Sequence, residues 1–384
     1  MITTTMPQDE YRAIPKHSAS VLKKVIGDGY SGASPKHAVT KDKAKASTDE
    51  GLMVHEFILE RELFLSKYVC GINPDDYPDA LTSVDQLKSA IDEINETRLP
   101  KLPLTGNLES LIEQVMHDSP DHLAHVSDIS KINTTEIKKL IKQINSAPNR
   151  GVLSKSGSSS DLYQRLVDNG WKGQYLPEIE KQHAIASEPR VALPYDEYTK
   201  YEEMYASLIN HLEVGARYEI ERNQDEYLFQ WLLYAFTTPE VMEKEVSMIG
   251  NEDKCRMDMM FKAGDHWYAF DLKKTVDASD EGFVKQAARY HYDLQAAHYS
   301  TVSHEVGRPL QTFGFIAIEP KPPYAVNVMI PDSEFIEIGY KKRAYAKKLL
   351  TEWQSKGDNT AYEPRAKALT AAPWSSYGKW MEDQ

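Results

Sequence analysis

The clearest hydrophobic pattern in the chain is a pair of apolar-rich runs that flank Gly264 and Asp265. A Gly-Asp pair between such runs predicts a β-hairpin with a two-residue turn. Counting outward from this turn places Asp258 opposite Asp271. Because side chains alternate along a strand, the other face of the hairpin carries only apolar residues, and we expect that face to pack on the core. These apolar residues are Met257, Met259, Phe261, Tyr268, Phe270 and Leu272.

Hydrophobic periodicity predicts further elements on both sides of the hairpin. A capped helix is expected after Ser18, and a second helix begins at Leu52 with His55 on or beside its buried stripe. Residues 243–249 predict a short strand that enters the hairpin and brings Glu245 near the aspartates. The remaining expectations are helices over 176–240, a long amphipathic helix after residue 274, strands at 311–319 and 324–330, a basic helix at 334–353 and an aromatic tail at 372–380 that could fold back on the core.

Residues 70–175 contain an approximate internal duplication. Residues 83–95 align with 133–145 at an offset of 50, and Leu111 aligns with Leu162 once one loop residue is added. Each copy, 83–116 and 133–167, predicts a helix, a loop and a helix. The second copy resembles half of a SAP-like helical module, and that family often binds DNA. The first copy is acidic, which favours a protein contact or a spacer, and an inserted bundle without separate function is the alternative.

Composition and charge restrict the class of protein. The chain has 384 residues, of which 41% are hydrophobic, so we expect two or three domains. No run approaches the roughly 18 apolar residues of a membrane span, and no signal-peptide core begins the chain, so we expect a cytoplasmic protein without membrane contact. The net charge of -13 argues against indiscriminate binding of nucleic acid. Cys70 and Cys255 alone supply neither a disulfide framework nor a four-cysteine cluster.

The two opposed aspartates are the main candidate for chemistry. Carboxylates directly opposite each other on paired strands repel unless something neutralises them, and a divalent cation such as Mg²⁺, which prefers oxygen ligands, would do so. Lys273 lies two residues beyond Asp271, where an ammonium could orient or activate a water. The alternative is an exposed polar strand face on which two aspartates happen to align. For His55, the alternative is a structural histidine of the core.

Five segments, in this order along the chain, resemble the PD-(D/E)xK nuclease superfamily. They are GLMVH, EVSMI, CRMDMM, FDLKK and QAAHY, and the set is most similar to the RecE-type exodeoxyribonucleases (exonuclease VIII), relatives of lambda exonuclease. The resemblance implies an α/β (α+β) fold with a restriction-endonuclease-like core, in which helices flank a central mixed sheet. It implies an N-terminal part of the core at 1–69, an inserted helical region at 70–175 and a main nuclease domain at 176–384.

The resemblance also implies a metal centre. His55, Asp258 and Asp271 would bind Mg²⁺ or Mn²⁺, with two ions expected and the carbonyl of Leu272 as a further ligand. Glu245 would support a metal or its waters. Lys273 would position the attacking water.

The resemblance also implies roles for four more residues. Gln295 and Tyr299 would brace the site and contact the DNA backbone, while Ser20, with Arg12 as partner, would hold the 5′ phosphate. The implied activity is processive 5′ to 3′ digestion of linear duplex DNA that leaves 3′ single-stranded tails. The implied partners are double-stranded DNA ends, a single-strand annealing recombinase and further copies of the chain in a ring, as in phage recombination systems. The alternatives are a DNA endonuclease or RecB-like nuclease module, and a non-catalytic DNA-binding scaffold.

Overall fold

The computed structural model describes residues 1–27, 34–40, 50–124, 129–222, 227–238, 240–357 and 360–369. The chain divides into two compact units, a sheet unit of residues 1–66 with 199–384 and a helical unit of residues 67–198. No helix among the described residues combines the length and apolarity that a membrane span requires. The expected aromatic tail at 372–380 lies outside the described residues.

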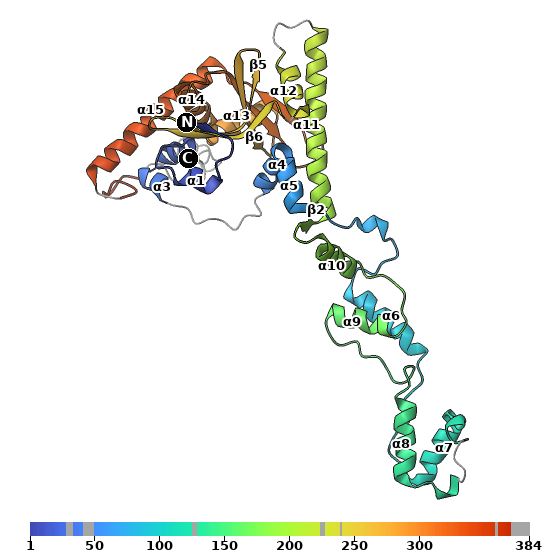
Figure 1. Cartoon of the computed structure of the whole chain (residues 1–384). Coiled ribbons are helices and arrows are strands. Elements are labelled where there is room, and N and C mark those ends of the chain that lie inside the picture. The colour runs from blue at the N-terminus through green and yellow to red at the C-terminus, as the bar shows by residue number, and fades with distance from the viewer. Residues whose placement is uncertain are drawn as a thin grey trace, which may run out of the picture. The chain divides into compact units, whose positions relative to one another are not determined.

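The sheet unit is built on six strands in the order β1-β4-β5-β6-β7-β8 (Figure 1). Neighbours are antiparallel except β6 and β7, which are parallel and are connected through two helices. A mixed sheet flanked by helices is therefore confirmed. The strands are β1 (Ile2–Thr3), β4 (Met242–Ile249), β5 (Lys254–Ala263), β6 (His266–Lys274), β7 (Leu310–Ile318) and β8 (Val326–Met329).

The helices of this unit include the predicted helix after Ser18, whose side chain caps α2 by accepting the Val21 N–H at 3.4 Å. The expected long helix after residue 274 is instead two helices, because His291 between them adopts a left-handed backbone with φ of 51°. The helices are α1 (Gln8–Ala13), α2 (Ala19–Ile26), α3 (Pro35–Val39), α4 (Glu50–Leu59), α5 (Arg61–Lys67), α11 (Tyr195–Glu221), α12 (Leu228–Thr237), α13 (Asp280–Arg289), α14 (Tyr292–Glu305) and α15 (Ser333–Lys356).

The hairpin of β5 and β6 has the predicted turn, since Ala263 pairs with His266 and Met260 with Ala269. The counted register does not extend to the aspartates. Pairing ends at Met259 and Phe270, and the Asp258 carboxylate instead accepts the backbone N–H of Leu272 at 2.8 Å. The two strands therefore separate where the aspartates lie.

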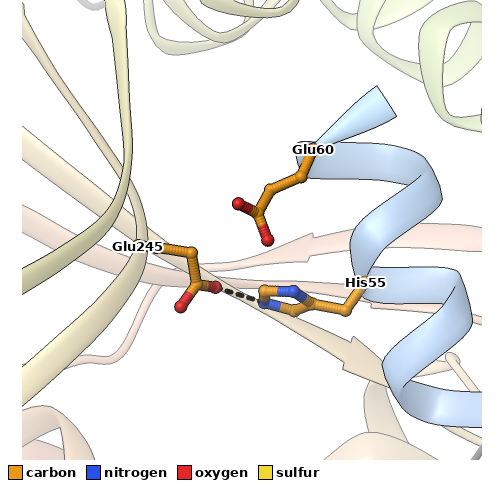
Figure 2. A group of neighbouring side chains, drawn as sticks. All are labelled: His55, Glu60 and Glu245. Carbon is orange, nitrogen blue, oxygen red and sulfur yellow. Dashed lines mark ion pairs between the residues drawn. The ribbon is translucent and has the colours of Figure 1, made fainter. Parts of the chain in front are cut away.

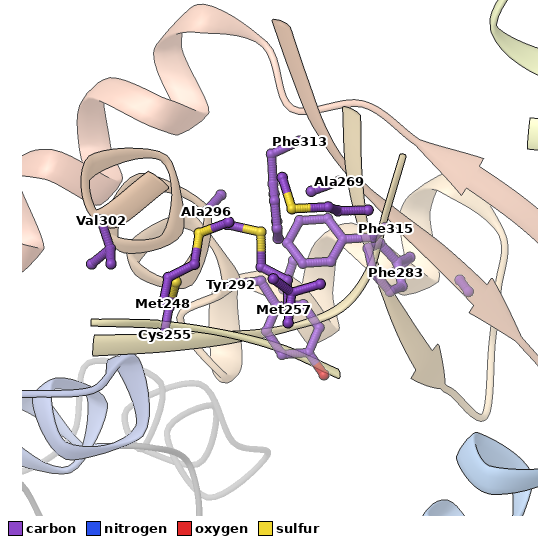
Figure 3. Close-up of a cluster of buried hydrophobic side chains, with 14 of the residues drawn as sticks. Met248, Cys255, Met257, Ala269, Phe283, Tyr292, Ala296, Val302, Phe313 and Phe315 are labelled. Atoms are coloured by element: carbon purple, nitrogen blue, oxygen red, sulfur yellow. The ribbon is translucent and has the colours of Figure 1, made fainter. Parts of the chain in front are cut away.

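The alternation of faces along β5 also breaks at this point. Met257 and Met260 are three residues apart, yet both belong to one buried cluster with Phe313, Phe315 and residues of α14 (Figure 3). The apolar face of the hairpin is largely buried, as expected, and Met260 of the other face is buried as well. A local irregularity accompanies the change, because Glu245 on β4, between the partners of Met257 and Met259, has a positive φ of 51°.

Helices α14 and α15 approach each other closely at Gly339. A β-carbon at this position would lie 2.0 Å from the Asp293 carbonyl oxygen, so a side chain forces the helices apart. We expect Gly339→Ala to lower the free energy of unfolding by about 1–3 kcal/mol, as other overpacked positions do. Urea denaturation measures this, with Lys348→Ala on the exposed face of α15 as the control. Equal stability of the two variants would contradict the close approach.

The helical unit contains the duplicated segment as four capped helices. The first copy forms α6 (Val84–Glu96) and α7 (Leu108–Asp118), and the second forms α8 (Thr134–Asn145) and α9 (Ser159–Asp168). The expected helical run from 176 begins with α10 (Leu176–Ser187) but is interrupted by β3 (Val191–Leu193), which pairs in parallel with β2 (Tyr68–Cys70). Short 3-10 turns lie at Pro74–Asp76, Pro120–His122 and Ile129–Lys131.

The two copies exchange their second helices. Leu87 and Ile91 of α6 pack with Leu162 of α9, whereas α7 packs with α8 in a separate cluster. Equivalent asparagines make equivalent bonds: the Asn95 side chain bonds both backbone groups of Leu153, and Asn145 does the same to Leu102. The duplication is therefore visible in three dimensions, with each first helix paired to the other copy's second helix.

Candidate active site

Helix α4 presents His55 from a firmly anchored scaffold. Phe57 of the same helix is fully buried, and its ring meets the rings of Phe64 and Tyr201 at centroid distances of 5.0 and 5.9 Å. At the start of the helix, the Glu50 carboxylate pairs with Lys200 at 2.5 Å and with Lys274 of β6 at 2.6 Å. Apolar packing and ion pairs together fix the helix, so that His55 is held beside the sheet.

The imidazole of His55 lies between two carboxylates. Its Nε2 is 3.4 Å from Glu245 Oε1, the pair drawn in Figure 2, and 3.3 Å from Asp258 Oδ2. Glu245 also forms an ion pair with Arg256, whose guanidinium donates to the Met6 carbonyl at 2.8 Å. Residues from a helix and two strands thus converge on one point.

Asp271 lies next to this point and is held by two side chains. Gln295 of α14 donates to its Oδ1 at 2.5 Å, and the ammonium of Lys273 pairs with its Oδ2. Lys23 of α2 donates to the side-chain amide oxygen Oε1 of Gln295 at 2.7 Å, which orients the amide. Gln295 therefore braces Asp271 and is only 5% exposed.

The charges of these groups are strongly coupled. Burial acts to lower the pKa of His55, but the nearby carboxylates, Asp258 first, outweigh it and raise that pKa to about 9. Burial and the Asp258 charge raise the pKa of Asp271, and burial raises that of Glu245. Burial is thus the largest cause of the raised pKa of both carboxyls, and the negative charge of Asp258 adds to all three pKa shifts.

A cavity of about 900 Å³ opens onto the site. Its walls include His55, Glu245 and Asp258, together with Ser20 and Arg12, which the resemblance links to a phosphate. Ser20 Oγ lies 2.9 Å from Ser18 Oγ, so that two hydroxyls sit together on the wall. Further lining residues are Gln8, Tyr11, Gly51, Leu52, Glu56, Glu60, Leu63, Arg256 and Tyr299.

The donor set fits a hard divalent cation. Ligand atoms on adjacent positions of an octahedral Mg²⁺ site lie about 3 Å apart, given metal–oxygen distances of about 2.0–2.1 Å. The observed separations of 3.3 and 3.4 Å between His55 and its two carboxylates are close to this value. His55, Glu245, Asp258 and the adjacent Asp271 could therefore hold the ion, and Lys273 stands beside Asp271.

Sequence reasoning missed Glu60, Arg256 and Lys23. Glu60 offers a carboxylate to the same group, since its ligand atom and those of His55 and Glu245 all lie within 4.8 Å of one another (Figure 2). The stretch HEFILE holds two glutamates, and nothing in its spacing distinguishes Glu60 from Glu56. Arg256 and Lys23 act through residues distant in sequence, which no local motif reveals.

Comparisons with known proteins give one family match and a structural neighbour of low similarity. Residues 178–362 match a family described as a PDDEXK-like domain of unknown function (DUF3799). A crystal structure of a "Putative exonuclease" from Eubacterium rectale is similar at 16% identity over 60% of this chain and 83% of that chain, with a TM-score of 0.31. No curated protein matches the sequence.

The family match spans less than half of the chain. It contains Glu245, Asp258, Asp271 and Lys273, and it leaves out His55 and the residues before it. Neither comparison singles out the RecE type. Residues 178–362 are therefore similar to a PDDEXK-like domain of unknown function, and most strands of the mixed sheet lie within this range.

Proposed function

We propose that this protein is a metal-dependent exodeoxyribonuclease that digests linear duplex DNA from 5′ to 3′ and leaves 3′ single-stranded tails for recombination. The observation that carries the proposal is the convergence of His55, Glu245 and Asp258 in one cavity, beside the Asp271–Lys273 pair. In the reaction, water adds to phosphorus and one phosphorus–oxygen ester bond breaks, which gives a phosphomonoester and an alcohol.

Negative charge grows on the phosphoryl oxygens during this step. A divalent cation in the site would neutralise that charge and make water more acidic, which is the usual contribution of metals to phosphodiester cleavage. Mg²⁺ or Mn²⁺, with two ions, is the composition we propose.

Lys273 contributes a fixed positive charge. Burial acts to lower its pKa, but Asp271 and further neighbours raise the pKa above its ordinary value, so that the side chain stays an ammonium at neutral pH. Its ammonium also lies 4.9 Å from the centre of the Tyr292 ring, which confines it from the side of α14. We therefore propose that Lys273 donates hydrogen bonds and positions the attacking water.

Ser20 and Arg12 support the choice of a 5′ end. Both line the cavity that holds His55, and a hydroxyl with a guanidinium is a suitable pair of donors for a terminal phosphate. Tyr299 lines the same cavity, which supports the proposal that it contacts the backbone of the strand. A ring of identical chains and a single-strand annealing recombinase complete the proposed assembly.

A substrate comparison tests this function. The full-length protein with Mg²⁺ is given a linear duplex with a 5′ phosphate, the same duplex without it, and a covalently closed circle. We expect rapid mononucleotide release from the first, slower release from the second and none from the circle. Cutting of the circle would point to an endonuclease, and loss of nucleotides from 3′ ends first would overturn the polarity.

A further inference from the structure

A further carboxylate, that of Glu60, faces the group formed by His55, Glu245 and Asp258. Glu60 follows the last residue of α4, and it lines the same cavity as these three residues. Figure 2 shows the Glu60 carboxylate directed toward the space beside the His55 ring and Glu245. Ligand atoms of Glu60, His55 and Glu245 lie within 4.8 Å of one another.

Hydrogen bonds anchor the backbone of Glu60. Its N–H donates to the Glu56 carbonyl at 2.8 Å, and its own carbonyl accepts the Phe64 N–H at 2.9 Å, so that hydrogen bonds continue across the junction of α4 and α5. Phe64 is fully buried against Phe57. The turn that carries Glu60 is thus anchored in the core.

The carboxylates at the site outnumber the lysine and arginine side chains that pair with them. Glu245 pairs with Arg256 and Asp271 pairs with Lys273. Within the described part of the chain, Asp258 has only the imidazole of His55 as a direct ionic partner, and Glu60 forms no ion pair with lysine or arginine. Carboxylates that exceed their cationic partners at one point are the usual environment of a bound divalent cation.

We propose that Glu60 is a further direct ligand of the divalent cation, on the side of the site that opens to the cavity. This inference rests on the proposed function and adds a donor to it. The group that it would bind is a hard divalent ion such as Mg²⁺ or Mn²⁺, since carboxylate oxygens favour such ions.

Titration with Mn²⁺ in the absence of DNA tests the inference. The full-length protein, Glu60→Gln and Glu56→Gln are titrated by calorimetry, with free Mn²⁺ followed by electron paramagnetic resonance. Glu56 is the matched control because it lies four residues earlier and lines the same cavity outside the cluster. We expect the dissociation constant for Mn²⁺ to rise about 10-fold or more in Glu60→Gln and to stay near the wild-type value in Glu56→Gln.

A change of ligand type separates direct coordination from a structural effect. Thiolates prefer softer metals than carboxylates do, so Glu60→Cys should bind Mn²⁺ more weakly and Cd²⁺ more tightly than the wild type. Glu56→Cys reports what an isolated thiol in the cavity contributes. Equal Cd²⁺ affinity of the two cysteine variants, or unchanged Mn²⁺ affinity of a folded Glu60→Gln, overturns the role of Glu60.

Asp258→Asn distinguishes failure of this inference from failure of the proposed function. If Asp258→Asn loses Mn²⁺ while Glu60→Gln keeps wild-type affinity, the metal centre is supported and only the Glu60 ligand is excluded. If the wild type itself binds no Mn²⁺, the proposed function fails together with the inference.

Discussion

Lys273→Ala is expected to lower the rate of duplex digestion by about 10²–10³-fold, the usual loss when one preorganised donor is removed from a charged transition state. Lys273 is the ammonium paired with Asp271, and its raised pKa keeps it charged. Removing it takes away a positive charge and a donor but leaves His55, Asp258 and the cavity wall in place. DNA affinity should therefore change little.

The measurement is release of labelled nucleotides from a linear duplex in Mg²⁺, with DNA binding followed by fluorescence anisotropy in Ca²⁺. Lys262→Ala is the matched control, since this lysine lies on the neighbouring strand β5 with about half of its side chain exposed. Circular dichroism checks that the variant folds, because Asp271 loses its partner. Digestion at the wild-type rate would refute the role of the lysine.

Asp258→Asn should abolish both metal binding and cleavage. Asp258 accepts the Leu272 N–H and contacts His55, so its carboxylate joins the separated strands to α4. An amide of equal size keeps the volume but removes the charge. Loss of the several kcal/mol that a metal supplies to the transition state corresponds to a rate decrease of about 10³-fold or more.

Two readouts follow this second variant. Cleavage is measured as above, and the rise of the melting temperature on adding Mn²⁺ reports binding to the folded state. Asp265→Asn serves as control because its side chain is fully exposed in the hairpin turn. A variant that is stabilised by Mn²⁺ as strongly as the wild type would show that the ion does not bind at Asp258.

Local patterns predicted much of the fold. The turn at Gly264 and Asp265 fixed the register of β5 and β6 near the turn, and the serine before α2 marked its start. Both signals act over a few residues, where backbone preference and alternation of faces dominate. These signals predict less well farther along the strands from the turn, and the expected pairing of Asp258 with Asp271 is absent.

The parts that could not be predicted depend on long-range geometry. Glu245 has a left-handed backbone although it is not a glycine, so the sequence carries no signal for this conformation. It lies opposite the point where β5 changes face. The duplication predicted four helices, but equivalent apolar stripes do not specify which helix packs with which, and α6 packs with α9. Glu60 reaches the site only because α4 and α5 meet at a buried aromatic contact.

The central claim is that His55, Glu245 and Asp258 share a divalent cation. The most direct measurement is a crystal structure of the protein with Mn²⁺, in which anomalous scattering locates the ion. We predict a peak within bonding distance of His55 Nε2 and an Asp258 carboxylate oxygen, beside the Asp271–Lys273 pair. A map with no peak there, or with Mn²⁺ only elsewhere on the protein, would contradict the account.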